Sequence, residues 1–121
     1  MLWWVAIAGA LGASARYAVH TVVQSRVAGL FPWGTVVVNL SGSFVLGLVA
    51  GLVLYQGLDA DVRTVAGTGF IGAYTTFSSY TYESLGLVED GVPRGAALNA
   101  VGSIAVGLVA ATAGLLLASV L

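Results

Sequence analysis

Residues 69–81 read GFIGAYTTFSSYT and lie inside an uncharged run, 64–82, that is long enough to cross a bilayer. Glycines lower helix stability, and Thr and Ser side chains compete for backbone hydrogen bonds. Irregular backbone at membrane depth persists only where protein buries it or where it lines a wet cavity. The segment therefore predicts a broken membrane helix on an ion or substrate pathway, and a helix packed through small residues is the alternative.

The amino-acid composition is that of an integral membrane protein. Of the 121 residues, 59% are hydrophobic and only 7% are charged, whereas soluble domains carry about 25% charged residues. The chain contains no Lys and no Cys, which excludes a Schiff-base lysine and a disulfide framework. A net charge of −1 without a basic patch disfavours nucleic acid as a partner. We expect no enzymatic activity, because the lone His20 has no evident nucleophile or metal-ligand cluster around it.

Runs of uncharged residues predict four membrane-spanning helices within one domain, residues 1–121, and hence a multi-pass protein of the cell membrane. A membrane helix needs about 20 such residues. Arg16 interrupts the first run, and we place it on an interior face of that helix. An N-terminal signal peptide is the alternative, but no Lys or Arg precedes its apolar run. The predicted spans are about 2–24, 33–55, 62–83 and 94–120.

The positive charges give no preferred orientation in the membrane. With the N-terminus inside, Arg63 and the terminal amine lie inside, while Arg26 and Arg94 lie outside. Because Lys and Arg in short loops normally set the orientation, this balance favours insertion in both orientations. Two opposite copies can then form an antiparallel dimer. A partner or lipid that fixes one orientation is the alternative.

Several polar and aromatic side chains in the predicted spans are candidates for an ion path. The Asn39 amide offers two donors and an acceptor, so it either suits a small anion or joins two helices. Phe77 and Tyr80 lie three residues apart on one helical face, where their electropositive ring edges either solvate an anion or pack in the core. Ser103 adds a hydroxyl from the fourth span, and Glu83 closes the third span as a pathway carboxylate or a solvated interfacial one.

Three motifs resemble the CrcB/Fluc fluoride channel family: GASARY at 12–17, GTVVVNLSGSF at 34–44 and GFIGAYTTFSSY at 69–80. The likeness runs over the full chain with the motifs in the family order, and the third motif is highly specific. The resemblance implies an all-α membrane protein of four transmembrane helices, with a break in the third, that forms an antiparallel, dual-topology homodimer in membrane lipid. It also implies passive, selective export of cytoplasmic fluoride through two narrow pores per dimer, and so fluoride resistance.

The resemblance further implies roles for particular residues. Arg16 and Glu83 match positions near the aqueous vestibule. The backbone carbonyls of Gly72 and Thr75 match ligands of a structural sodium ion between the subunits, and a hard cation prefers such oxygen ligands. The positions that match the fluoride pore are Asn39, Phe77, Ser78, Ser79, Tyr80 and Ser103.

Two tyrosines depart from the family pattern. Tyr80 replaces the second pore phenylalanine and brings a hydroxyl to the pore, while Tyr74 places a polar-tipped ring before the threonine pair. Such changes leave open a pair with an unlike subunit of the family, although a homodimer is favoured because Asn39 and Phe77 are intact. The alternative function is a small proton-coupled multidrug or cation exporter that uses Glu83. Exporters of that kind need a carboxylate in the first span, which contains none.

Overall fold

The computed structural model describes residues 2–27, 31–75, 84–91 and 93–121. In these residues the chain forms helices joined by short turns, and no strand is present. The prediction of an all-α chain is therefore confirmed for the described part. Three helices in that part are long and apolar enough to cross a membrane: Leu2–Ser25, Trp33–Gln56 and Pro93–Ser119.

Most of the elements are α-helices, and two stretches are wider π-helices, which are labelled η. In chain order they are α1 (Leu2–Ser25), α2 (Trp33–Gln56), α3 (Ala60–Val62), η1 (Arg63–Ile71), α4 (Gly72–Tyr74), a helix over 84–89, α6 (Pro93–Ala97), η2 (Leu98–Gly102) and α7 (Ser103–Ser119).

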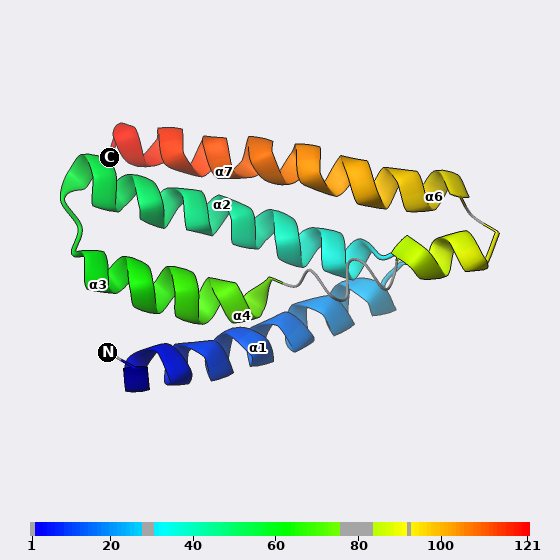
Figure 1. The fold of residues 1–121 in the computed structure, drawn as a ribbon, viewed down its shortest axis with the longest axis horizontal. Helices are drawn as coiled ribbons and strands as arrows, with labels where there is room; N and C mark the ends of the chain where they lie inside the picture. Colours follow the sequence, from blue (N-terminus) through cyan, green and yellow to red (C-terminus); the bar gives the residue numbers. More distant parts are fainter. Residues whose placement is uncertain (1, 28–30, 76–83, 92) are drawn as a thin grey trace.

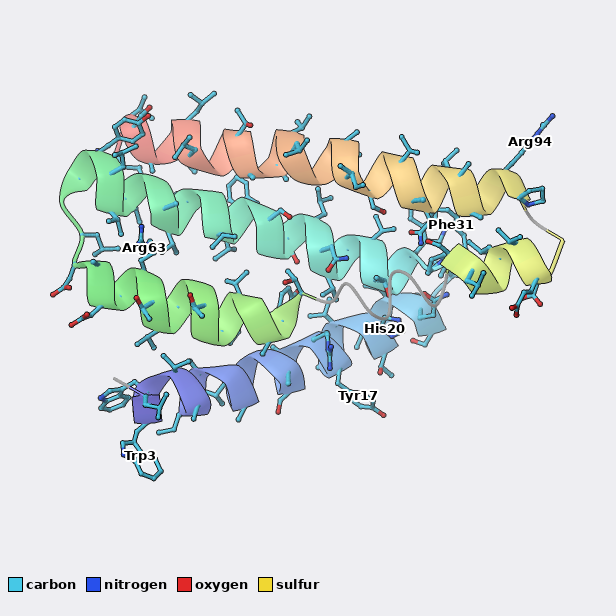
Figure 2. All side chains as sticks on the ribbon, in the orientation of Figure 1. Trp3, Tyr17, His20, Phe31, Arg63 and Arg94 are labelled. Carbon is cyan, nitrogen blue, oxygen red and sulfur yellow. The ribbon has the colours of Figure 1, made fainter. Side chains whose placement is uncertain are left out.

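Runs that follow one another in the sequence are antiparallel, so α7 is parallel to α2 and the α3–η1–α4 run is parallel to α1. Figure 1 shows their order across the bundle. α7 lies along α2, the α3–η1–α4 run lies on the other side of α2, and α1 crosses beneath that run. Both chain termini and the connection from α2 to α3 are at one end, while the end of α1 and the start of α2 lie toward the other. The positive charges are found at both ends of the bundle: Figure 2 shows Arg63 at one end and Arg94 at the other.

Glycines let the helices approach one another closely at two contacts. Between α2 and α7, a Cβ on Gly47 would overlap the backbone of Ala111, and one on Gly114 would overlap the Phe44 carbonyl. Between α1 and η1, a Cβ on Gly12 would overlap the Phe70 backbone. Small residues provide this close backbone approach in membranes, where the lipid removes the hydrophobic drive for helices to associate.

The α3–η1–α4 run begins at an Asp59 cap and ends abruptly at Thr75. The Asp59 carboxylate accepts from the Asp61 backbone N–H at 2.9 Å, which satisfies one of the unpaired donors of the first turn. At Thr75 the backbone changes to an extended conformation, φ −81° and ψ 156°. The predicted break in the third span, and the count of four helices, stay predictions because 76–83 lie outside the described residues.

Candidate functional site

A cavity of about 420 Å³ lies between α2, the end of the α3–η1–α4 run and α7. We call this cavity the polar groove, because an amide and three hydroxyls share its wall with small and aliphatic side chains. No charged side chain is among its described lining residues. The polar members are Asn39, Ser43, Thr75 and Ser103.

The polar groove brings together residues that are distant in the sequence. Asn39 and Ser43 lie one turn apart on α2, Thr75 follows the end of α4, and Ser103 begins α7. All of these side chains are half-buried in the single chain. The sequence-predicted residues Asn39, Thr75 and Ser103 therefore line one cavity, although nothing in it tests their roles.

Thr75 is held where the helix stops. Its backbone N–H and its hydroxyl both donate to the Ile71 carbonyl, at 2.9 Å and 3.0 Å. Its methyl group lies against Gly42 of α2, where a Cβ would overlap it. Gly72, three residues earlier, donates its backbone N–H to the Gly67 and Gly69 carbonyls. Of the two predicted sodium-binding positions, Gly72 thus lies in the last turn of α4, and Thr75 is the first residue with extended backbone.

Ser103 is linked to a buried asparagine that the sequence analysis did not single out. The Ser103 hydroxyl donates to Asn99 Oδ1 at 3.3 Å, and Asn99 Nδ2 donates to Ser84 Oγ at 2.7 Å. Asn99 is 0% exposed and lies in η2, and π-helical turns are often found at functional sites. Its signal in the sequence was an amide one helical turn before Ser103 in an otherwise apolar segment.

The remaining predicted residues lie away from the groove or outside the described residues. Arg16 is half-buried on α1 and is not among the residues that line the groove. Figure 2 shows Tyr17, its neighbour on α1, pointing away from the other helices, and Trp3 pointing outward near the start of α1. The predicted site residues outside the described part of the chain are Phe77, Ser78, Ser79, Tyr80 and Glu83.

The fold and this groove define a class: a multi-pass membrane protein with a cavity between its helices, whose described lining residues include an amide and hydroxyls but no charged side chain. The family described as CrcB-like protein, Camphor Resistance (CrcB), matches residues 3–115. The chain belongs to this family, which confirms the resemblance predicted from the motifs.

Curated relatives in the family carry a more specific name. The chain is 50% identical to fluoride-specific ion channel FluC 1 of Leifsonia xyli subsp. xyli over 111 residues, 92% of this chain and 81% of the relative. It is 43% identical to fluoride-specific ion channel FluC 1 of Streptomyces avermitilis over 122 residues, 100% of this chain and 98% of the relative. It is 46% identical to fluoride-specific ion channel FluC 2 of Moorella thermoacetica over 120 residues, 98% of this chain and 97% of the relative.

Proposed function

We propose that this protein is a passive, fluoride-selective ion channel that exports cytoplasmic fluoride across the cell membrane and so confers fluoride resistance. The observation that carries the proposal is the match over nearly the whole chain to relatives named as fluoride-specific ion channels. The polar groove supports it on physical grounds.

Fluoride is small and strongly hydrated, so a selective pore must replace its water with hydrogen-bond donors. An asparagine amide supplies two donors and each hydroxyl supplies one. Asn39 brings such an amide to the described groove lining, which carries no charged side chain. The Ser103 hydroxyl also lines the groove, but in the single chain it donates its proton to Asn99 Oδ1. Neutral donors bind the anion less tightly than a buried cation would, and conduction requires that the ion can leave again.

The other pore positions come from the family resemblance. We assign Phe77 and Tyr80 to the pore as ring edges, and Ser78 and Ser79 as hydroxyls beside them. Arg16 and Glu83 are assigned to the aqueous vestibule. Phe77 either lines the pore or packs in the core, and a substitution at this position distinguishes the two.

We expect Phe77→Ile to slow fluoride efflux from reconstituted vesicles by up to about tenfold. Isoleucine keeps apolar bulk but removes the ring quadrupole, whose geometry contributes about 0.5–1.5 kcal/mol, and about 1.4 kcal/mol corresponds to a tenfold change in rate. Tyr80→Phe is the matched control, because it keeps the ring, and we expect flux within about threefold of the unsubstituted rate. Normal flux through folded Phe77→Ile would instead place Phe77 in the core.

The functional unit is proposed to be an antiparallel, dual-topology homodimer with two pores. In the single chain the polar side chains of the groove, Asn39, Ser43, Thr75 and Ser103, are only half-buried. Polar groups at membrane depth need protein or a wet cavity around them. A second copy would cover the groove and close a narrow path. The loop arginines support opposite orientations, since Arg63 and Arg94 lie at opposite ends.

Tags placed at either terminus should be detected on both faces of the membrane. The reason is that the arginines near the two ends balance, and Lys and Arg in short loops set orientation. Adding three Lys residues to the 57–59 loop should bias insertion and lower fluoride efflux. Co-expression of a copy biased the other way should restore it. Tags confined to one face would contradict the antiparallel homodimer and favour an unlike partner subunit.

A structural sodium ion is proposed at the dimer interface, held by the backbone carbonyls of Gly72 and Thr75. Helix α4 ends at Tyr74, and the last carbonyls of a helix need partners from outside it. A hard cation with oxygen ligands meets that need and adds a positive charge between the subunits. The donor set therefore fits the ion.

Fluoride efflux from reconstituted vesicles, followed with a fluoride electrode, distinguishes a passive fluoride channel from a proton-coupled exporter. A passive channel carries net charge, so efflux should start only when valinomycin lets K⁺ leave with the anion. Imposing a proton gradient in the absence of fluoride should move no organic cation. Cation uptake driven by protons, with no fluoride efflux, would contradict the proposal and support the Glu83-dependent exporter.

A further inference from the structure

Tyr74 and Ser41 form a hydrogen bond that joins the end of α4 to α2. Tyr74 is the last residue of α4 and is 8% exposed. Its hydroxyl lies 2.9 Å from the Ser41 hydroxyl. Ser41 Oγ also lies 2.8 Å from the Val37 carbonyl and 3.1 Å from the Val38 carbonyl, and it donates its single proton to these acceptors. Tyr74 is therefore the donor in the bond between the two side chains.

This bond belongs to a compact set of contacts around the point where the helix stops. The Tyr74 ring stacks on Phe70 of η1, with centroids 6.0 Å apart and an interplanar angle of 16°. Gly42, the neighbour of Ser41, lies under the Thr75 methyl group, and a Cβ there would be 3.2 Å from the Tyr74 ring. The last turn of α4 is thus held against α2 by the bond between the side chains of residues 41 and 74. It can pack this closely because Gly42 has no side chain.

The same contacts lie directly beside the polar groove. Thr75 follows Tyr74 directly and lines the groove. Asn39, which also lines it, lies on α2 three residues before Gly42, the residue that the Thr75 methyl group contacts. A shift of the last α4 turn away from α2 would therefore move Thr75 relative to Asn39. Groups that recognise a small ligand must be held to within about 0.5 Å by the residues behind them.

We propose that Tyr74 is a positioning residue for fluoride selectivity. Its hydrogen bond to Ser41 holds the Thr75 end of α4 at a fixed separation from Asn39, so that the groove excludes the larger chloride ion. This inference rests on the proposed function and goes beyond it, because neither side chain of the Ser41–Tyr74 pair lines the groove. A tyrosine hydroxyl that is merely satisfied in the core would affect stability and leave ion selectivity unchanged.

The test measures initial fluoride and chloride efflux from vesicles, with thermal unfolding measured alongside, for Ser41→Ala, Tyr74→Phe and the double variant. Ser41→Ala leaves the buried Tyr74 hydroxyl without its acceptor, and we expect the fluoride-to-chloride ratio to fall about tenfold. Tyr74→Phe leaves Ser41 bonded to the Val37 carbonyl, so its ratio should fall about threefold. Adding Tyr74→Phe to Ser41→Ala should bring the ratio back to that of Tyr74→Phe alone.

Two exposed residues of α1 provide matched controls. Ser14 donates back to the Ala10 carbonyl at 2.9 Å, as Ser41 does to its own helix, and Tyr17 is 75% exposed. Ser14→Ala and Tyr17→Phe should leave the ratio unchanged. If Ser41→Ala does not fold, Tyr74→Phe decides, because it keeps the ring and the volume.

If the unsubstituted protein is selective and the folded Ser41 and Tyr74 variants have the same fluoride-to-chloride ratio, the positioning role is overturned. The proposed channel function would still stand. A loss of thermal stability without a change in the ratio would have the same meaning. An unsubstituted protein that passes no fluoride would overturn the proposed function and the positioning role together.

Discussion

Asn39→Leu should slow fluoride efflux from reconstituted vesicles by about 10- to 100-fold. Leucine has nearly the same shape but removes both amide donors from the groove wall. A hydrogen bond to a charged group contributes about 1.5–3 kcal/mol, and about 1.4 kcal/mol in a barrier is a tenfold change in rate. The measurement is the initial efflux rate per reconstituted dimer, with dimer formation checked by size-exclusion chromatography.

Gln56→Leu is the control for this substitution. Gln56 is an amide on the same helix, but its Nε2 donates to the Ala118 carbonyl at 2.9 Å, at the end of the bundle and away from the groove. We expect flux within about threefold of the unsubstituted rate. Normal flux through Asn39→Leu would mean that Asn39 only joins helices and that the fluoride path lies elsewhere.

Gly47→Ala should abolish most of the folded protein or lower its unfolding free energy by about 2–3 kcal/mol or more. A Cβ at Gly47 would overlap backbone atoms of Ala111, which cannot move aside unless α2 and α7 separate. Gly102→Ala is the matched control, since nothing lies within 4 Å of a Cβ at Gly102. The measurement is the unfolding free energy of the Gly47→Ala and Gly102→Ala variants in detergent. Equal values for the two variants would contradict the close contact between α2 and α7.

The membrane-length helices were predictable from the sequence because the bilayer imposes a simple rule. A run of about 20 residues without charge has to satisfy its backbone internally, and a helix does so. The same rule gives no information on local helix type. The π-helical turns of η1 and η2 depend on how glycines and neighbouring helices accommodate an extra residue, and no periodicity in the sequence marks them.

The groove was predictable only in part. Asn39 and Ser103 were singled out because an amide or hydroxyl in an apolar run needs a partner, and the structure brings both to one cavity with Thr75. The bonds of Asn99 to Ser84 and of Tyr74 to Ser41 were not predicted. Cross-helix pairs depend on the rotation and height of each helix, which tertiary packing decides.

Initial rates of fluoride and chloride efflux from the same vesicles test the fluoride-selective channel most directly. Vesicles are loaded with both salts, valinomycin starts the flux, and two ion-selective electrodes follow the anions. We expect fluoride to leave rapidly, while chloride leaves no faster than from protein-free vesicles. Chloride efflux as fast as fluoride efflux, or fluoride efflux no faster than from protein-free vesicles, would contradict the proposed function.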